Sequence, residues 1–248
     1  MNNLFITEVR LKDEPEELKA SYVHALPVVQ NLTALSFRKP VTFFAGENGT
    51  GKSTLLEAIA LCCGFNPEGG TRNFSFSSKD THSPLFKRLA VTRGVRRPKD
   101  GFFLRAESFY NLATEVDRLD EIPARTPRLI HSYGGKSLHN QSHGESFLSL
   151  ILNRFGEDGL YILDEPEAAL SPSSQLTLLA QLHQLTAKGA QFIIATHSPI
   201  LMAYPQADIY VLTRDAIALT PYKETEHYLL TKQFLDCPER MLKLLLEE

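Results

Sequence analysis

The stretch VTFFAGENGTGKST, residues 41–54, decides the fold of this 248-residue chain. Val41 to Ala45 is a short, β-rich and mostly apolar run. The next eight residues, Gly46 to Ser53, fit the pattern G-x-x-x-x-G-K-[ST], and leucines with helical spacing follow. Between a strand and a helix, such a turn lets backbone N–H groups converge on phosphate oxygens, because glycine has no Cβ to obstruct them. The stretch therefore predicts a phosphate-binding loop.

The polar residues of this loop match the needs of a nucleoside triphosphate with Mg²⁺. Lys52 supplies a positive charge to the β- and γ-phosphates, Ser53 a hydroxyl to Mg²⁺, and Thr54 assists at an inner phosphate. An ordinary glycine turn with a surface lysine is the alternative, which the agreement of pattern and flanks disfavours. We expect ATP and Mg²⁺ as cofactors, with the remaining nucleotide contacts made by Gly46, Glu47, Asn48, Gly49, Thr50 and Gly51.

A second motif supplies two carboxylates. The apolar run 160–163 reads as a strand, and Asp164 and Glu165 follow it directly. Ligands bind at the carboxyl ends of strands in open α/β sheets. Asp164 is therefore predicted to hold the metal, directly or through a water, and Glu165 to act as general base toward the attacking water. The alternative is a pair of carboxylates that caps the next helix.

Strand and helix signals alternate along the chain. Strands are expected at 4–11, 41–45, 160–163, 191–195, 209–212 and 216–219, and helices at 53–63, 107–119, 142–155 and 173–188. This alternation predicts an α/β fold whose mostly parallel sheet is covered on both faces. We expect a single domain over 1–248, with an insertion at about 67–150 whose 67–99 part is mobile, and a helical tail at 225–248 broken near Pro238.

Charge and composition limit the possible partners. The net charge of −3 argues against wholesale binding to phosphate backbones, yet residues 71–105 carry nine basic residues against two acidic ones. This segment suits nucleic acid, or is simply a solvated surface, because aromatic residues are not interleaved with the charges. Three cysteines without zinc-type spacing favour a cytoplasmic setting. No apolar run is long enough to predict a membrane-spanning segment.

These motifs, together with SHGE at 142–145 and THSP at 196–199, resemble the ABC-type ATPases. Within them the chain is most similar to small stand-alone bacterial AAA-family, RecF-like ATPases related to SMC heads. Ser142 lies 22 residues before Asp164, and His197 lies 33 after it, as in that family. The resemblance implies a P-loop NTPase fold with an antiparallel N-terminal β portion and an inserted helical arm. It also implies an ATP-dependent homodimer, in which each nucleotide lies between two head-to-tail copies.

The resemblance further implies roles outside the phosphate loop. Ser142 and Gly144, followed by Glu145, would bind the γ-phosphate of the other copy, although the motif also reads as a helix N-cap. His197 would be a catalytic switch histidine that contacts the γ-phosphate, whereas a lone histidine is more often structural.

Three further positions are less typical of the family. Glu107 stands where the family has a glutamine, so either it completes the metal shell or it opens a helix at the favourable end of the dipole. Tyr22 either stacks on adenine or packs in the core. Ser171 replaces the usual aspartate of the D-loop, the segment 167–172.

The leading hypothesis is an ATP-hydrolysing switch that dimerises around ATP and acts on DNA or on a partner protein. Three alternatives stay open: the nucleotide-binding subunit of a membrane transporter, a non-hydrolysing ATP-gated interaction module, and a small-molecule kinase. The kinase would not need the 142–145 motif.

Overall fold

The computed structural model describes residues 3–12, 22–71, 83–121 and 128–246. Its larger sheet has six strands in the order β5-β6-β7-β3-β8-β9, and only β9 runs antiparallel to its neighbour. The mostly parallel sheet predicted from the sequence is confirmed. The strands are β3 (Val41–Gly46), β5 (Asp100–Arg105), β6 (Gly159–Asp164), β7 (Gln191–Ala195), β8 (Ala207–Leu212) and β9 (Ile217–Leu219).

A smaller antiparallel sheet has the order β2-β1-β4, formed by β2 (Ala34–Ser36), β1 (Ile6–Leu11) and β4 (Leu89–Arg93). The expectation that residues 67–99 form a mobile segment is therefore wrong for residues 83–93. There the short helix α3 (Leu85–Arg88) runs into β4, and the buried Leu85 and Leu89 hold both in the core. Of that segment, residues 72–82 lie outside the described part of the chain.

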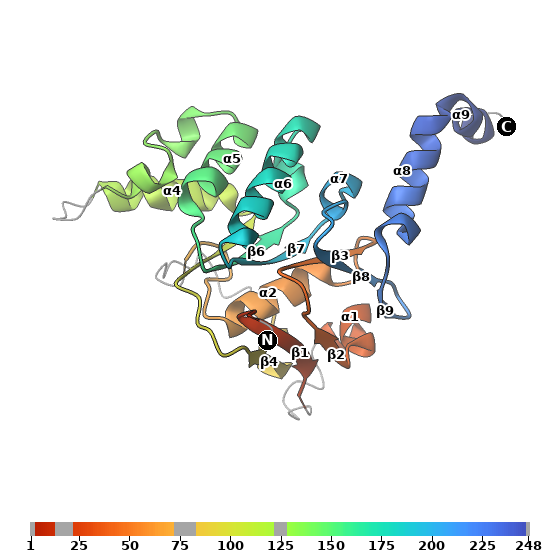
Figure 1. Ribbon diagram of the computed structural model, residues 1–248, viewed down its shortest axis with the longest axis horizontal. Helices are drawn as coiled ribbons and strands as arrows, with labels where there is room; N and C mark the ends of the chain where they lie inside the picture. The colour runs from red at the N-terminus through yellow and green to blue at the C-terminus, as the bar shows by residue number, and fades with distance from the viewer. Residues whose placement is uncertain (1–2, 13–21, 72–82, 122–127, 247–248) are drawn as a thin grey trace.

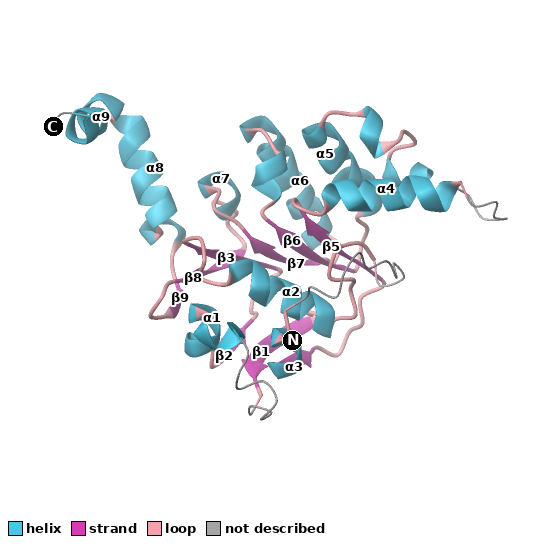
Figure 2. Cartoon of the chain, turned by 180° about the vertical axis from the view of Figure 1, so that it is seen from behind, coloured by secondary structure: helices cyan, strands magenta, loops and turns pink. Residues whose placement is uncertain are grey.

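Helices cover both faces of the larger sheet (Figure 2). The helix α2 (Lys52–Cys62) lies between the two sheets. On the other face lie α4 (Phe109–Asp120), α5 (His143–Arg154), α6 (Pro172–Ala187) and α7 (Pro199–Met202). Smaller elements are α1 (Pro27–Asn31) and the 3-10 turns η2 (Tyr22–Ala25), η3 (Leu129–Tyr133), η4 (Leu138–Asn140), η5 (Pro166–Ala169) and η6 (Tyr222–Glu224).

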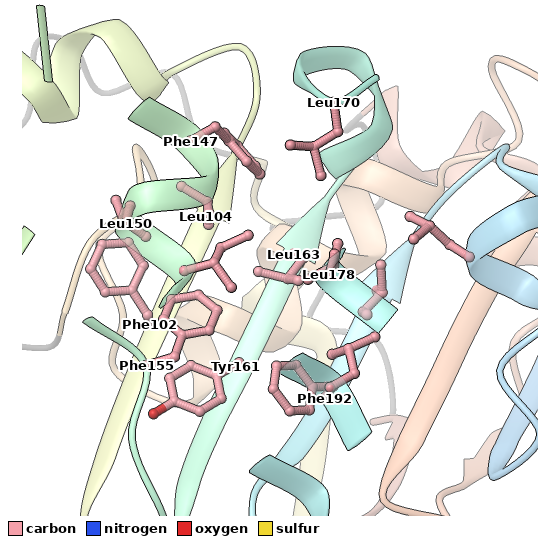
Figure 3. Close-up of a cluster of buried hydrophobic side chains, with 14 of the residues drawn as sticks. Phe102, Leu104, Phe147, Leu150, Phe155, Tyr161, Leu163, Leu170, Leu178 and Phe192 are labelled. Atoms are coloured by element: carbon pink, nitrogen blue, oxygen red, sulfur yellow. The ribbon is translucent and has the colours of Figure 1, made fainter. Parts of the chain in front are cut away.

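The strand β6 shows why apolar and polar residues do not alternate along the strands of the larger sheet. Its Tyr161 and Leu163 point into the cluster under α5 and α6 (Figure 3), whereas Leu160 and Ile162 point toward α2. Because successive side chains of a strand face opposite sides, a strand that is covered on both faces must be apolar throughout.

The chain ends in two helices, α8 (Glu226–Asp236) and α9 (Pro238–Leu246), which extend away from the body (Figure 1). The predicted break near Pro238 is confirmed, and the described part of neither helix contains a buried residue. Across the described ranges, no helix combines the length and the apolar character that crossing a membrane requires.

One buried polar side chain links the two sheets. Gln191 of β7 accepts hydrogen bonds from the backbone N–H groups of Phe5 and Ile6 at 2.8 and 2.9 Å, and its amide donates to the Ile6 carbonyl at 2.9 Å. These bonds satisfy backbone groups where the chain enters β1.

The parallel strands bring four chain segments to one edge of the sheet. Arg105 at the end of β5 lies opposite Asp164 of β6, and Asp164 lies opposite Ala195 of β7. Ala195 in turn pairs with Phe44 of β3. The loops that follow these strands therefore meet at the carboxyl edge.

Candidate active site

The phosphate loop connects β3 to α2 through three glycines with positive φ. The φ angles are 134° at Gly46, 81° at Gly49 and 96° at Gly51. A Cβ on Gly46 would lie 2.0 Å from the Leu212 carbonyl oxygen, and one on Gly51 would lie 2.5 Å from a methyl of Val28. Both positions therefore require glycine. Gly51 is also the N-cap of α2 and offers no side chain, so the first N–H groups of α2 remain suited to a phosphate.

The loop holds its lysine in place. Lys52 is buried, and its ammonium donates to the carbonyl oxygens of Gly46 and Glu47, both at 2.8 Å. Burial lowers the pKa of Lys52, against the opposing charges of Glu165 and Asp164. A cation folded over an amide-lined turn fits the phosphates of a nucleotide.

Ser53 and Asp164 meet as the sequence predicts. The Ser53 hydroxyl donates to Asp164 Oδ1 at 3.0 Å. Burial raises the pKa of Asp164 to about 6, against the opposing effects of the Arg105 charge and the Ser53 hydrogen bond. Hydroxyl and carboxylate oxygens are ligands that Mg²⁺ prefers, so the pair fits this ion.

A cavity of about 230 Å³ opens over this pair. Glu107 and Glu165 line it together with Ser53 and Asp164, so the structure brings the three predicted metal ligands to one place. The Glu107 side chain is 83% exposed and contacts Arg105 at 3.3 Å. Among the described residues, no three His, Cys, Asp or Glu side chains gather closely enough to hold a metal by themselves. An ion here would need Ser53 and phosphate oxygens as further ligands.

Arg105 is a member of the site that the motifs of the sequence do not indicate, because in the sequence it stands only as one basic residue of the segment 71–105. Its guanidinium lies 2.8 Å from Glu57 Oε2 on α2 and 3.5 Å from Asp164 Oδ2. Arg105 thus compensates the buried carboxylate of Asp164. Only the pairing of β5 with β6 brings the two together, and the sequence gives no signal of that pairing.

Glu165 has an unusual backbone. Its φ of 49° and ψ of 52° are left-handed, and Asp158 is the only other non-glycine with positive φ in the described ranges. The N–H of Glu165 donates to the Ala195 carbonyl at 3.0 Å, which ties this turn to β7. Such conformations persist where the surroundings enforce them, and they concentrate at functional sites. The turn places the Glu165 carboxylate at the wall of the cavity.

His197 follows β7 and faces Glu165, with 3.6 Å between His197 Nε2 and Glu165 Oε1. This Nε2 is buried, and no described residue forms a hydrogen bond with it. Burial and then the Lys52 charge lower the pKa of His197, against the charge of Glu165. A neutral imidazole with an unsatisfied nitrogen fits contact with a phosphate oxygen.

Glu167 is a second residue whose role the sequence analysis missed. Its carboxylate accepts a hydrogen bond from the His197 backbone N–H, and burial raises the pKa of Glu167. Glu167 therefore positions the loop that carries the histidine. The sequence separation of 30 positions hides this contact in the sequence.

The 142–145 motif forms the exposed N-terminus of α5. Ser142 is the N-cap and forms a capping box, in which its hydroxyl accepts from the Glu145 N–H at 3.4 Å and Glu145 Oε2 accepts from the Ser142 N–H at 3.1 Å. The Ser142 hydroxyl also donates to Glu145 Oε2 at 2.6 Å. The N-cap interpretation of the sequence is thus confirmed, and binding to a γ-phosphate stays a prediction. A Cβ on Gly144 would lie 2.8 Å from the Ala169 carbonyl oxygen, so glycine lets α5 approach η5 closely.

The structure also bears on the predictions for two remaining positions, Tyr22 and Ser171. Tyr22 is 63% exposed, so the alternative interpretation, in which this side chain packs in the core, is wrong. Its stacking on adenine stays a prediction. Ser171 caps α6 by accepting a hydrogen bond from the Ser174 N–H at 3.2 Å.

Comparisons with known proteins agree with this geometry. A family model described as an AAA domain matches residues 20–111, and one described as "AAA domain, putative AbiEii toxin, Type IV TA system" matches residues 145–203. A putative ABC transporter ATP-binding protein of Caldanaerobacter subterraneus is 30% identical over 203 residues, which cover 75% of this chain and 82% of the relative. The energy-coupling factor transporter ATP-binding protein EcfA2 of Methanospirillum hungatei is 26% identical over 80% of this chain, which spans about half of that relative (52%).

A solved ATP-binding cassette of an ABC transporter, MJ1267, has a similar fold, with a TM-score of 0.52 at 19% identity over 96% of this chain and 98% of that one. The fold and the glycine loop define a P-loop nucleotide-binding protein. The chain belongs to the ABC-type ATPases, whose members hydrolyse ATP, and the resemblance seen in the sequence is confirmed.

Proposed function

We propose that the chain is a Mg²⁺-dependent ATPase subunit that powers a membrane transporter from the cytoplasm. The observation that carries the ATPase part is the meeting, at one sheet edge, of Lys52, the Ser53–Asp164 pair and the left-handed Glu165. An amide-lined loop, a metal site and a base beside one cavity are the parts that phosphoryl transfer to water requires.

Each residue then has a defined task. Lys52 and the loop N–H groups bind the phosphates, and Ser53 and Asp164 hold Mg²⁺, which neutralises phosphate charge when bound. Glu165 accepts the proton of the attacking water. His197 donates its Nε2–H to a phosphate oxygen, for which its unsatisfied, buried nitrogen is suited.

The exposed N-terminus of α5 completes the site of a second copy. A helix N-terminus favours anions, and Ser142 lies at its tip with its hydroxyl exchangeable between Glu145 and a phosphate. Two copies arranged head to tail would therefore enclose two nucleotides, which makes the homodimer dependent on ATP.

The names of the relatives favour a transporter as the driven assembly, because the two sequence relatives described above are named as transporter ATP-binding proteins. The nucleic-acid alternative loses support from the basic segment, because four of its described basic residues bind acidic or carbonyl groups of this same chain. Arg96 and Lys99 form ion pairs with Asp158, Arg93 donates to the Cys62 carbonyl, and Arg105 belongs to the active site. These contacts reduce the charge available to a phosphate backbone.

Tagged protein isolated from its own cells tests the proposal. A transporter subunit should co-purify in near-equal amounts with a membrane-embedded protein from detergent extracts, and its ATPase rate should not respond to DNA. Stimulation by single- or double-stranded DNA without such a partner would contradict the transporter assignment. Absence of ATP turnover with and without the partner would instead favour the ATP-gated module.

A further inference from the structure

A histidine of the C-terminal helices lies against the histidine of the active site. His227 is in the first turn of α8, and its Nε2 lies 3.3 Å from His197 Nδ1. The start of α8 is fixed there, because the buried Thr225 caps the helix by accepting a hydrogen bond from the Tyr228 N–H. Both helices beyond this point extend away from the body (Figures 1 and 2). The contact thus joins the root of α8 to the catalytic loop.

The other nitrogen of His197 faces the reaction site. His197 Nε2 is buried without a hydrogen bond from any described residue, and the atom opposite it at 3.6 Å is a carboxylate oxygen of Glu165. An ionised carboxylate only accepts hydrogen bonds, and so do most oxygens of a bound triphosphate. A nitrogen in this place must therefore carry the hydrogen to interact favourably.

A neutral imidazole has one N–H and one lone pair, so the partner of Nδ1 decides which nitrogen carries the hydrogen. If His197 donated from Nδ1 to His227, its Nε2 lone pair would face the Glu165 carboxylate. If His227 donates from Nε2, His197 Nδ1 accepts and Nε2–H points to Glu165. Only the second arrangement gives both ring nitrogens of His197 a complementary neighbour.

We propose that His227 is a positioning residue, which donates its Nε2–H to His197 Nδ1 and so holds His197 as the tautomer with Nε2–H directed at the phosphate site. This inference rests on the proposed role of His197 in the reaction. His227 itself touches no reacting atom. The arrangement follows the general rule that the hydrogen bond of one ring nitrogen sets the state of the other.

The electrostatic surroundings agree with a neutral pair. Burial lowers the pKa of both histidines, the Lys52 charge lowers both further, and the acidic neighbours Glu165 and Glu226 act in the opposite direction. Two protonated rings would have only donors to offer each other across the 3.3 Å contact.

Steady-state ATP hydrolysis by three variants tests the proposal. His227→Phe keeps a ring but removes the donor, and we expect kcat to fall about fivefold to tenfold with KM for ATP changed less than about twofold. His227→Gln places an amide N–H close to the position that the Nε2–H of His227 has in the wild type. This variant should therefore restore at least half of the wild-type kcat. His197→Ala should lose kcat at least as strongly as His227→Phe.

The outcomes distinguish a failure of the His227 inference from a failure of the proposed function. Loss of kcat in His197→Ala, but not in His227→Phe, would overturn the inference and leave the proposed function intact. Equal losses in the Phe and Gln variants would also overturn it, because they would indicate a packing role. Unchanged turnover in His197→Ala would refute the role of His197 and the inference together.

Imidazole ¹⁵N spectra give a readout that does not depend on turnover. In the nucleotide-free protein at pH 7.5, well above the ordinary histidine pKa of about 6.5, His197 should show a protonated Nε2 and an unprotonated Nδ1. His227→Phe should convert this to a mixture of tautomers, and His227→Gln should not. A wild-type spectrum with hydrogen on Nδ1 of His197 would overturn the proposal directly.

Discussion

Asp164→Asn should stabilise the nucleotide-free protein while it abolishes ATP hydrolysis. Asp164 is only 5% exposed, and burial is the main reason that its pKa rises from 3.8 to about 6. The folded protein therefore holds an ionised carboxylate at a cost that the unfolded chain does not bear. Asparagine has nearly the same shape and removes this charge.

The size of the effect follows from the two pKa values. A rise from 3.8 to about 6 means that about 3 kcal/mol of unfolding free energy, available while Asp164 is protonated, is absent at a pH above both values. Because the folded pKa is the higher one, this stability is fully present below about pH 4 and is lost as the pH rises through about 6. Asparagine can still accept from Ser53, but it turns an N–H toward Arg105 Nε, which lies 3.5 Å from Asp164 Oδ2. We therefore expect a net gain of about 1 to 2 kcal/mol at pH 8.

Urea unfolding of both proteins in EDTA, without nucleotide, measures this gain. The variant should exceed the wild type at pH 8, and its advantage should shrink by about 1 kcal/mol at pH 5. In a chain of this length, a gain of 1 to 2 kcal/mol corresponds to a melting temperature about 2 to 6 °C higher. A variant that is less stable at pH 8, or whose advantage grows on acidification, would refute the assigned burial cost.

Three further substitutions test single contacts. Lys52→Ala removes the ammonium from the phosphate loop and should abolish nucleotide binding measured by equilibrium dialysis; tight binding would exclude the assigned role. Glu165→Gln should bind ATP normally, turn over about 100-fold more slowly or worse, and accumulate as an ATP-bound dimer in light scattering; hydrolysis at the parental rate would mean that another group is the base. Gln191→Leu leaves backbone groups of Phe5 and Ile6 unpaired and should cost about 2 to 4 kcal/mol in urea unfolding, with ATP affinity unchanged below the transition; a neutral effect would show that water replaces the side chain.

The sequence predicts much of the fold because its decisive elements are locally encoded. The strand at 191–195 is found with its predicted bounds, and the glycine loop is specified by residues that only a positive φ or a close approach explains. The strand β4 was missed, since its five residues end in a polar pair and gain their place only by pairing with β1. Local patterns do not contain such pairing.

The parts of the site that lie within one sequence motif were predictable. The parts that form where segments distant in the sequence come together were not. Lys52, Ser53 and Asp164 were found from two motifs, and the structure places them together. Arg105 and His227 were missed, because the first depends on which strand neighbours β6 and the second on where the final helices dock.

In the proposed dimer, ATP binds between the phosphate loop of one copy and the α5 N-terminus of another. Mixing two inactive variants tests it. Lys52→Ala disables the loop, and Ser142→Asp keeps an N-cap acceptor while placing a negative charge against the γ-phosphate. In a head-to-tail dimer, each mixed pair contains one intact site, so equal mixing should restore about a quarter of the wild-type rate if copies exchange freely. A mixture as inactive as its two components, with exchange confirmed by mass, would contradict the account.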